Sequence, residues 1–337
     1  MNNNIYGIDL GTCNFKIFCK STGEVLKEKN TIAVKDKNTL YAYGDSAYEM
    51  YEKAPEDIRV IFPVVSGVIA EFDYLQKMIF DYLEEKMKMK LRNAEFVVAI
   101  PTAVTKVEER AFYQVFKNSK YKPKNVLLCK KPIAAAVGLG LDVNEPTGIM
   151  LVDIGAETTE ISVISLGGIV SKELVDVGGN KIDEDIVSYI RKEFNLVIGK
   201  KTGKALKESI GSALPPTEEN SKVIVGRDVV SGLPIEKEIS ADVVYEAMQS
   251  NLTTICNAIK VILEKTPPEL AKDIIHSGIY VTGGSSMIQG LDTLFEQITN
   301  IKINSADNPE DSVVRGLVEI VSDPKYKSLT YIPKEKL

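Results

Sequence analysis

The chain has 337 residues, 44% of them hydrophobic and 26% charged, and a formal net charge of −6. One hydrophobic core of ordinary size does not accommodate this length, so we expect two domains of a soluble globular protein. The acidic balance argues against a general binder of nucleic acid or anionic lipid. Because His276 is the only histidine in the sequence, histidine-based triads and histidine metal sites are disfavoured as well.

No apolar run approaches the roughly 18 residues of a membrane-spanning helix. Met1 to Asn4 lead directly into a predicted strand, which leaves no room for a signal peptide, and we therefore expect a cytoplasmic protein. The cysteines show neither metal-binding nor redox spacing and are interpreted as reduced thiols, mostly in the core. They are Cys13, Cys19, Cys129 and Cys256.

The first predicted element is a hairpin over residues 5–18, in which two apolar strands flank a turn that follows Asp9 and contains Gly11. The lysine-rich region that follows, up to Ile61, has short strand-like pieces and one helical segment, residues 45–53. Such a weakly patterned region is typical of a small inserted subdomain.

The next region alternates predicted helices and strands. Residues 72–83 carry apolar side chains at helical spacing, and buried strands are predicted over 96–100 and 126–129. A capping-box pattern starts a helix near Thr105. Pro132 then opens an Ala-rich helix, whose small side chains allow close packing on neighbouring elements.

A second hairpin, over residues 149–164, repeats the first: when Asp153 is aligned with Asp9, Gly155 aligns with Gly11. Asp is depleted in strands, and a polyphosphate with its cation would explain two such positions. Glycines let the backbone approach phosphates, turn N–H groups and Thr hydroxyls bond phosphate oxygens, and carboxylates hold the waters of Mg²⁺. The repeat suggests two related halves.

Beyond the second hairpin, a strand is predicted over 169–177 and a helix over 181–195. The polar segment 199–237 has weak strand patterns and is interpreted as a second inserted subdomain. Ser240 is predicted to cap a long helix that ends at Pro267-Pro268.

A third glycine turn follows, because the apolar residues 279–282 run into Gly283-Gly284. Two Asp hairpins closed by a Gly-Gly turn predict a nucleotide cleft between domains. The alternation of strands and helices predicts an α/β fold with largely parallel sheets. The lysine-rich tail, residues 325–337, is predicted to be mobile.

These elements together resemble the actin-like ATPase superfamily and, more narrowly, the MreB family of bacterial actin homologues. The matching motifs occur in the family's order over nearly the whole chain, and a related chaperone would need a peptide-binding domain for which no sequence remains. The motifs are Gly7 to Thr12, Pro63 to Asp73, Pro132 to Ala136, Val152 to Gly155, Thr158 to Glu160, Gly178-Gly179, Ile210 to Ala213, Pro267 to Ala271 and Thr282 to Gly284.

The resemblance implies an actin-like, ribonuclease-H-like fold of two α/β lobes, each with a small inserted subdomain. It also implies ATP or ADP with Mg²⁺ between the lobes and assembly of protomers into filaments. The expected boundaries are 1–31, 62–140 and 309–337 for the core of lobe I (IA), 32–61 for its small subdomain (IB), 141–180 and 240–308 for the core of lobe II (IIA), and 181–239 for its small subdomain (IIB).

The resemblance also assigns roles by position. Asp9 and Asp153 would hold Mg²⁺ through waters, and Thr158 would help to position the attacking water. Lys16 would reach the β- or γ-phosphate, although a solvated strand lysine is an equally good interpretation. The other expected nucleotide-binding residues are Gly11, Thr12, Cys13 and Asn14 in the first phosphate loop, Gly155, Ala156, Glu157 and Thr158 in the second, Gly179, Lys207 and Glu208 toward the base or ribose, and Gly283, Gly284 and Ser285 on the adenosine side.

Two positions depart from the MreB pattern. Lys131 replaces the Glu that positions the attacking water, and an ammonium has no acceptor for a water proton. Loss of such a group typically costs roughly 10²–10⁴ in rate, more than a nearby cation is expected to restore, so we expect weak or impaired ATP hydrolysis. Glu157 replaces a glycine; either it pairs with Lys131 or its side chain turns to solvent.

The segment 86–92 lies close to the position of a hydrophobic membrane-binding loop in the family. Its cations alternate with Met87, Met89 and Leu91, so it could insert these side chains while its charges meet anionic lipid. The alternative is a helix end whose basic residues complement the helix dipole.

We therefore expect an ATP-binding, filament-forming cytoskeletal protein, with a role in cell shape and possible peripheral membrane contact. One alternative is a catalytically silent scaffold in a filament mixed with paralogous subunits. A more remote alternative is a small-molecule kinase on the same fold, because fold alone does not fix function. No nucleic-acid partner is expected.

Overall fold

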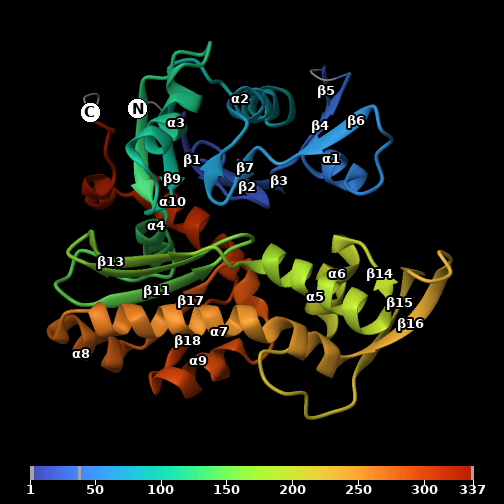
Figure 1. The fold of residues 1–337 in the computed structure, drawn as a ribbon. Coiled ribbons are helices and arrows are strands. Elements are labelled where there is room, and N and C mark those ends of the chain that lie inside the picture. Colours follow the sequence, from blue (N-terminus) through green and yellow to red (C-terminus); the bar gives the residue numbers. More distant parts are fainter. Residues whose placement is uncertain (1–3, 37–38, 335–337) are drawn as a thin grey trace. The chain divides into compact units, whose positions relative to one another are not determined.

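The computed structural model describes residues 4–36 and 39–334, which form two compact units. Unit 1 comprises Met1–Thr147, Ile164–Ile169 and Glu310–Leu337, and unit 2 comprises Gly148–Val163 and Val170–Pro309. Each unit has a five-stranded sheet and a hydrophobic core of its own. Figure 1 shows the strands and helices of both units. Strands and helices alternate along the chain, so the predicted α/β class is confirmed.

The main sheet of unit 1 has the strand order β10-β9-β1-β2-β3. Strand β1 pairs in parallel with β9 and antiparallel with β2, which confirms the first predicted hairpin. Because β10, β9 and β1 are parallel, their carboxyl ends reach the same edge of the sheet. The strands are β1 (Ile5–Leu10), β2 (Asn14–Cys19), β3 (Glu24–Lys29), β9 (Glu95–Ile100) and β10 (Asn125–Lys130).

The helices of unit 1 include an unusually close pair, α4 and α10. A Cβ atom at Gly316 would overlap the Ala134 carbonyl oxygen, and one at Gly138 would overlap the Ser312 carbonyl oxygen, so only glycine fits at this crossing. The close packing predicted for the Ala-rich helix is therefore confirmed. These helices are α2 (Phe72–Asp81), which continues in a π-helical turn (Tyr82–Lys86), α3 (Lys106–Lys117), α4 (Lys131–Gly138) and α10 (Ser312–Ser322).

Three further features complete unit 1. The capping box at Thr105 is present at the start of α3. A small sheet of order β5-β4-β6 packs with α1, and β7 pairs with β8. Their bounds are β4 (Ile32–Lys35), β5 (Thr39–Tyr43), α1 (Asp45–Met50), β6 (Ile58–Ile61), β7 (Val64–Val65) and β8 (Val68–Ile69).

The C-terminal segment is ordered up to residue 334, so the predicted mobility of the tail is wrong there. After the 3₁₀ turn η4 (Pro324–Leu329), Tyr331 forms an isolated bridge with Leu128 through two backbone hydrogen bonds of 2.8 and 3.0 Å. Backbone pairing to an existing strand fixes a segment that side-chain composition alone would leave in solvent. Residues 335–337 lie outside the described range.

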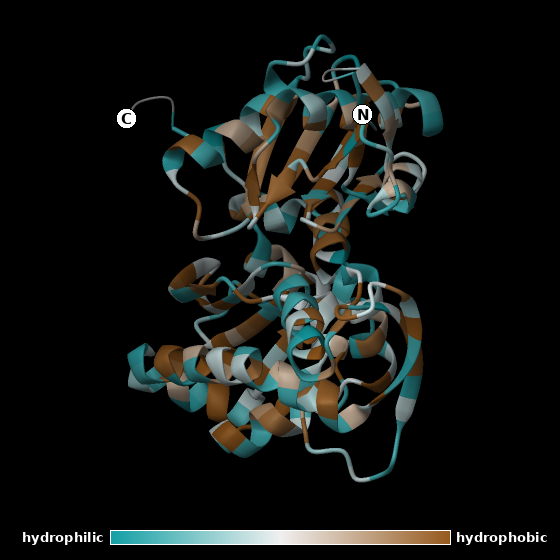
Figure 2. Ribbon diagram, turned by 45° about the vertical axis from the view of Figure 1, so that its right-hand side comes forward, coloured by the Kyte–Doolittle hydropathy of each residue, from teal (hydrophilic) through white to brown (hydrophobic). Residues whose placement is uncertain are grey.

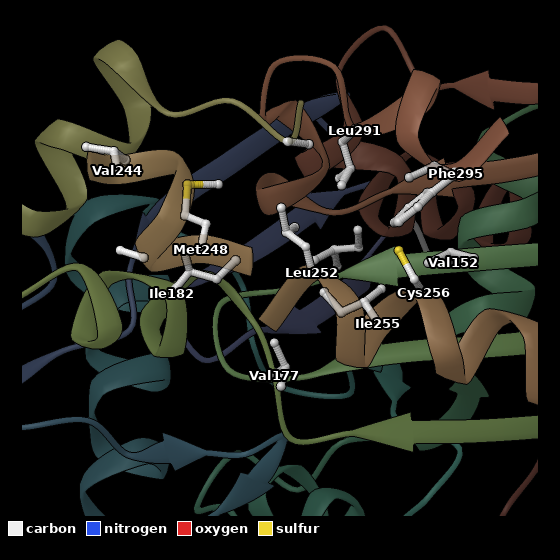
Figure 3. Close-up of a cluster of buried hydrophobic side chains, with 14 of the residues drawn as sticks. Val152, Val177, Ile182, Val244, Met248, Leu252, Ile255, Cys256, Leu291 and Phe295 are labelled. Atoms are coloured by element: carbon white, nitrogen blue, oxygen red, sulfur yellow. The ribbon is translucent and has the colours of Figure 1, made fainter. Parts of the chain in front are cut away.

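The main sheet of unit 2 has the strand order β13-β12-β11-β17-β18, in which β11, β17 and β18 are parallel. The long helix α7 runs along this sheet in Figure 1, and Figure 3 shows Leu252 and Ile255 of α7 in the same apolar cluster as Val152 of β11. The elements are β11 (Ile149–Ile154), β12 (Thr159–Ser165), β13 (Gly168–Val175), α7 (Ala241–Lys265), β17 (Ile279–Thr282) and β18 (Ile303–Ser305).

The remaining elements of unit 2 were only partly predicted. Local sequence patterns did not predict helices α6, α8 and α9 of unit 2 or α10 of unit 1. Ser240 does occupy the N-cap position of α7, but its side chain makes no capping hydrogen bond. The elements are α5 (Gly179–Phe194), β14 (Leu196–Val197), α6 (Lys200–Ile210), β15 (Ser221–Asp228), β16 (Pro234–Ser240), α8 (Pro268–Ser277), the 3₁₀ turn η2 (Gly284–Met287) and α9 (Leu291–Thr299).

Within each unit, the hydropathy of a residue depends on whether it lies in the sheet or in a helix. Figure 2 shows hydrophobic residues concentrated on the sheet strands, whereas the helices carry alternating hydrophilic and hydrophobic residues. All four cysteines are unbridged, and Cys19, Cys129 and Cys256 are buried, as predicted. Across residues 4–36 and 39–334, no helix combines the length and the apolar character needed to cross a bilayer.

Candidate functional site

The first predicted phosphate loop links β1 to β2 in unit 1 and is braced by Asn30. The fully buried Asn30 donates its side-chain amide to the Gly11 carbonyl oxygen over 2.8 Å and its backbone N–H to the Cys13 carbonyl oxygen over 3.0 Å. A Cβ at Gly11 would lie 2.7 Å from the Asn14 carbonyl oxygen, so the turn requires glycine. Sequence reasoning missed Asn30, because nothing local distinguishes it from other turn asparagines.

Asp9, at the end of β1, is paired with Lys131. Lys131 is the first residue of α4, and its ammonium lies 3.1 Å from Asp9 Oδ1 and 3.2 Å from the Leu10 carbonyl oxygen. The two residues meet because β10, which leads into α4, ends at the same sheet edge as β1. A cation of the protein itself therefore contacts the first carboxylate predicted to hold Mg²⁺.

Lys16 faces Asp9 across the β1–β2 register but has other partners. Its ammonium lies 3.3 Å from Asp311 Oδ1 and donates to the Glu310 carbonyl oxygen, and its side chain is only 5% exposed. The interpretation as a solvated strand lysine is therefore wrong, whereas the phosphate contact stays a prediction. Lys27 bonds the Glu310 carboxylate and thereby lowers the pKa of that group.

Lys130, next to Lys131, has separate partners. Its ammonium lies 3.3 Å from Glu109 Oε1 and 5.6 Å from the centroid of the Tyr331 ring, and Tyr331 donates its hydroxyl to the same carboxylate. Burial raises the pKa of Tyr331, and its hydrogen bond to Glu109 adds to the rise. The adjacent lysines therefore serve different carboxylates of unit 1.

The second predicted phosphate loop, residues 155–158 of unit 2, is closed by a hydrogen bond of 2.9 Å from Gly155 N–H to the Thr158 carbonyl oxygen. The start of α5 packs directly on it: Gly179 N–H donates to the Gly155 carbonyl oxygen over 3.0 Å. A Cβ at Gly178 would lie 2.7 Å from backbone atoms of Ala156 and Glu157. The match of Gly178-Gly179 to the family pattern thus has a steric reason.

The Gly-Gly turn after β17 lies against the same loop. Gly283 has φ +88°, and a Cβ there would overlap Asp153 Oδ1. Its N–H donates to the Pro309 carbonyl oxygen over 3.0 Å, and Ser285 Oγ donates to the Gly155 carbonyl oxygen over 2.8 Å. Unit 2 therefore brings together, from distant parts of the chain, a carboxylate, a glycine loop and a second glycine turn.

Lys207 and Glu208, predicted near the base or ribose, differ in their surroundings. Lys207 is buried, and its ammonium lies 2.7 Å from Asp183 Oδ1 and 2.8 Å from the Gly179 carbonyl oxygen. Glu208 is exposed, and its Oε1 lies 3.7 Å from Lys204 Nζ. Burial raises the pKa of Asp183, and the Lys207 ammonium offsets part of that rise. Lys207 thus fixes the start of α5, and a nucleotide contact by either residue stays a prediction.

A metal ion would depend on waters and phosphate oxygens at these loops. Within residues 4–36 and 39–334, no group of three or more His, Cys, Asp or Glu side chains is arranged to hold a metal. Asp9 contacts the Lys131 ammonium, and water-mediated binding of Mg²⁺ by Asp9 and Asp153 stays a prediction. The predicted pair between Lys131 and Glu157 would join residues of different units and stays a prediction.

The predicted membrane-inserting side chains pack inward in this structure. Leu91 is 3% exposed and belongs to the core of unit 1, and Met87 and Met89 pack against that core. Alternation of charged and apolar residues is also the pattern of a segment that covers a hydrophobic core. The segment 86–92 covers the core of unit 1 in this way.

The chain has close relatives among known proteins. The MreB/Mbl protein family model matches residues 3–328. The chain is 36% identical over 334 residues to the cell shape-determining protein Mbl of Bacillus subtilis (strain 168), covering 98% of both proteins. It is also 36% identical over 323 residues to the cell shape-determining protein MreB of Escherichia coli (strain K12), covering 94% of this chain and 92% of that protein.

Solved structures agree with this assignment. MreB5 of Spiroplasma citri superimposes with a TM-score of 0.92 when bound to AMPPNP, at 35% identity and 98% coverage of both chains. Its ADP-bound form gives a TM-score of 0.90 with 96% of this chain covered and 98% of that chain. A MamK double helical filament superimposes with a TM-score of 0.80 at 20% identity, with 95% of this chain and 98% of that chain covered. This likeness supports the fold alone. The actin-like fold and the predicted family are thus confirmed, and the chain belongs to the MreB/Mbl family of bacterial actin homologues.

Proposed function

We propose that this protein binds ATP and ADP and assembles into filaments that contribute to cell shape. The observation that carries the proposal is the convergence, within unit 2, of Asp153, the glycine loop that begins at Gly155, and the Gly283 turn. Relatives that are 35–36% identical are named as cell shape-determining proteins or are bound to AMPPNP or ADP.

The loops supply what a polyphosphate requires. Turns built on Gly11 and Gly155 allow a phosphate to approach the backbone closely, and Lys16 adds a positive charge in unit 1. Asp153 would hold Mg²⁺ through waters, and the ion would neutralise phosphate charge when bound. Nucleotide binding is tested by titrating the protein with a fluorescent ATP analogue and displacing it with ADP. Absence of saturable binding under all conditions would remove the proposal.

ATP hydrolysis is proposed to be slow. Lys131 cannot accept a proton from an attacking water, and its ammonium is paired with Asp9. The expected loss is roughly 10²–10⁴ in rate relative to an enzyme with a water-positioning group. Phosphate release is measured for the wild type and for Lys131→Glu, with nucleotide binding as a control; a wild-type rate equal to or above that of Lys131→Glu would contradict the proposal. No release by either protein would favour the catalytically silent scaffold.

Filament formation is tested by pelleting with ATP, ADP and a non-hydrolysable analogue. A protein that forms its own filaments pellets above a critical concentration without any other subunit. Pelleting only after addition of a paralogous subunit would instead favour a mixed filament. A protein that stays in the supernatant in every combination contradicts assembly.

The pair between Lys131 and Glu157 is a separate proposal, tested by a double-mutant cycle. If the two side chains interact, the ATPase effects of Lys131→Glu and Glu157→Gly are non-additive in the double variant. Additive effects would show that they act independently and favour a Glu157 side chain that turns to solvent.

Peripheral membrane contact is proposed at residues 86–92, through the exposed side chains of Lys88 and Lys90 rather than the packed apolar ones. Exposing Leu91 would cost about 1.5–3 kcal/mol. Each lysine, in contrast, would contribute about 1 kcal/mol of attraction to anionic lipid without any local unfolding. In co-sedimentation with anionic vesicles, the wild type should pellet more than Lys88→Glu/Lys90→Glu. Equal pelleting, or pelleting with neutral vesicles as well, would contradict this contact.

A further inference from the structure

We propose that Lys131 acts as a built-in cation at Asp9, so that nucleotide binding depends less on Mg²⁺ than it would with the Asp9 carboxylate unpaired. The proposal rests on the nucleotide-binding function proposed above and concerns the charge that this function requires. The contacts on which it depends all lie within unit 1.

The contact between the two residues is short and shielded from water. The Lys131 ammonium lies 3.1 Å from Asp9 Oδ1, and the side chains are only 14% and 9% exposed. The same ammonium donates to the Leu10 carbonyl oxygen over 3.2 Å. Because the start of α4 holds the lysine at the end of β1, solvent and salt screen this pair less than a surface pair.

The neighbouring lysines do not replace Lys131 in this role. Lys16 lies opposite Asp9 in the strand register, but its ammonium is 3.3 Å from Asp311 and bonds the Glu310 carbonyl oxygen. Lys27 bonds the Glu310 carboxylate. In this arrangement, Lys131 is the lysine that balances the charge of Asp9.

This arrangement changes what a bound metal ion would contribute. A carboxylate attracts hydrated Mg²⁺ through its negative charge, and an ammonium at 3.1 Å largely cancels that charge. Without a cation, the same carboxylate would repel an approaching polyphosphate. Lys131 removes this repulsion in advance, and Asp9 therefore no longer requires a metal ion to tolerate phosphate nearby.

The experiment is an equilibrium binding titration with ADP and AMPPNP, in Mg²⁺ and in excess EDTA. For the wild type, the two dissociation constants should agree within about threefold. For Lys131→Met, which keeps an unbranched side chain without charge, removal of Mg²⁺ should weaken binding by about tenfold or more. Lys131→Glu should show at least the same dependence, and Lys131→Arg should behave like the wild type.

Lys130→Met is the matched control. It removes a neighbouring charge that contacts Glu109 instead of Asp9, so its binding should remain independent of Mg²⁺. Thermal unfolding without nucleotide reports whether each variant is folded. If Lys131→Met is unfolded, the comparison of wild-type dissociation constants in Mg²⁺ and in EDTA still tests the proposal, because it does not use this variant.

Three results would overturn the inference. A wild-type protein that binds nucleotide only with Mg²⁺ contradicts it while leaving the proposed nucleotide binding intact. Binding by Lys131→Met that stays independent of Mg²⁺ shows that another group supplies the charge, and equal effects of Lys130→Met and Lys131→Met show a non-specific charge effect. Failure of the wild type to bind nucleotide in either condition refutes the proposed function itself.

Discussion

The two Asp hairpins share a sequence pattern but are stabilised in different ways. The loop after β1 is braced by a polar side chain, the buried amide of Asn30, and its Asp9 is paired with Lys131. The loop after β11 is braced by backbone packing, in which Gly178 and Gly283 leave no room for a Cβ. Equivalent loops can therefore be fixed either by hydrogen bonds and charge or by the absence of side chains.

This difference decides which substitutions each loop tolerates. In unit 2, Gly178 and Gly283 have no side chain to lose, and a Cβ added to either would overlap backbone atoms or Asp153. The Ser285 hydroxyl adds one side-chain hydrogen bond to the same loop. In unit 1, Asn30 and Lys131 act through polar groups, so truncation of either side chain is harmful. Gly283→Ala and Asn30→Ala test this distinction, and Glu310→Gln tests an ion pair of unit 1 outside the loop.

Gly283→Ala should have the largest effect. The residue has φ +88°, and the added Cβ would overlap Asp153 Oδ1 and the Ile154 carbonyl oxygen. We expect a loss of about 2–4 kcal/mol in the free energy of unfolding, measured in urea, because backbone strain and overpacking add. Nucleotide binding should weaken as well, since the Asp153 carboxylate must move.

Gly232→Ala separates these two causes. Gly232 has φ +74°, but a Cβ there meets no atom within 4 Å, so only the backbone strain, about 1–2 kcal/mol, should appear. Equal losses in the two variants would mean that contact with Asp153 contributes nothing.

Asn30→Ala should have an intermediate effect. It removes the amide of a fully buried side chain and leaves the partly buried Gly11 carbonyl oxygen without this donor, which typically costs about 1–3 kcal/mol. Urea unfolding measures the loss, and titration with ADP should show weaker binding. Asn257→Ala, at an exposed position of α7, is the control and should change stability by less than about 0.5 kcal/mol. Similar values for the two variants would remove Asn30 as a brace.

Glu310→Gln should have the smallest effect, visible in its pH dependence. The hydrogen bond from Lys27 lowers the pKa of Glu310 below its ordinary value of 4.5. Ionised Glu310 therefore stabilises the folded state fully above pH 4.5, and this contribution is lost as the pH falls through the lowered pKa. Thermal unfolding midpoints of wild type and variant should converge on acidification, and a constant difference across the same range would contradict the ionic role. Added salt should also reduce the difference, because the side chain is partly exposed.

Features that depend on local pattern were predictable from the amino-acid sequence. Both hairpins, the Gly-Gly turn and the α/β class follow from short apolar runs, glycines and their order, and the motif order was enough to identify the family. Helices such as α6 and α10 were not predicted because their polar, glycine-containing or short apolar sequences become helical only when they pack against neighbouring elements.

The partners of the charged and polar residues depend on the fold and could not be predicted from local pattern. Lys131 reaches the Leu10 carbonyl oxygen across 121 positions of sequence, and Lys16 reaches Glu310 across 294. Leu91, which the sequence pattern predicted to contact the membrane, is buried in the core of unit 1 by the same packing. Local pattern shows which side chains are charged or apolar, but the energy of a charge depends on its neighbours in space, and those are fixed by strand order and helix packing.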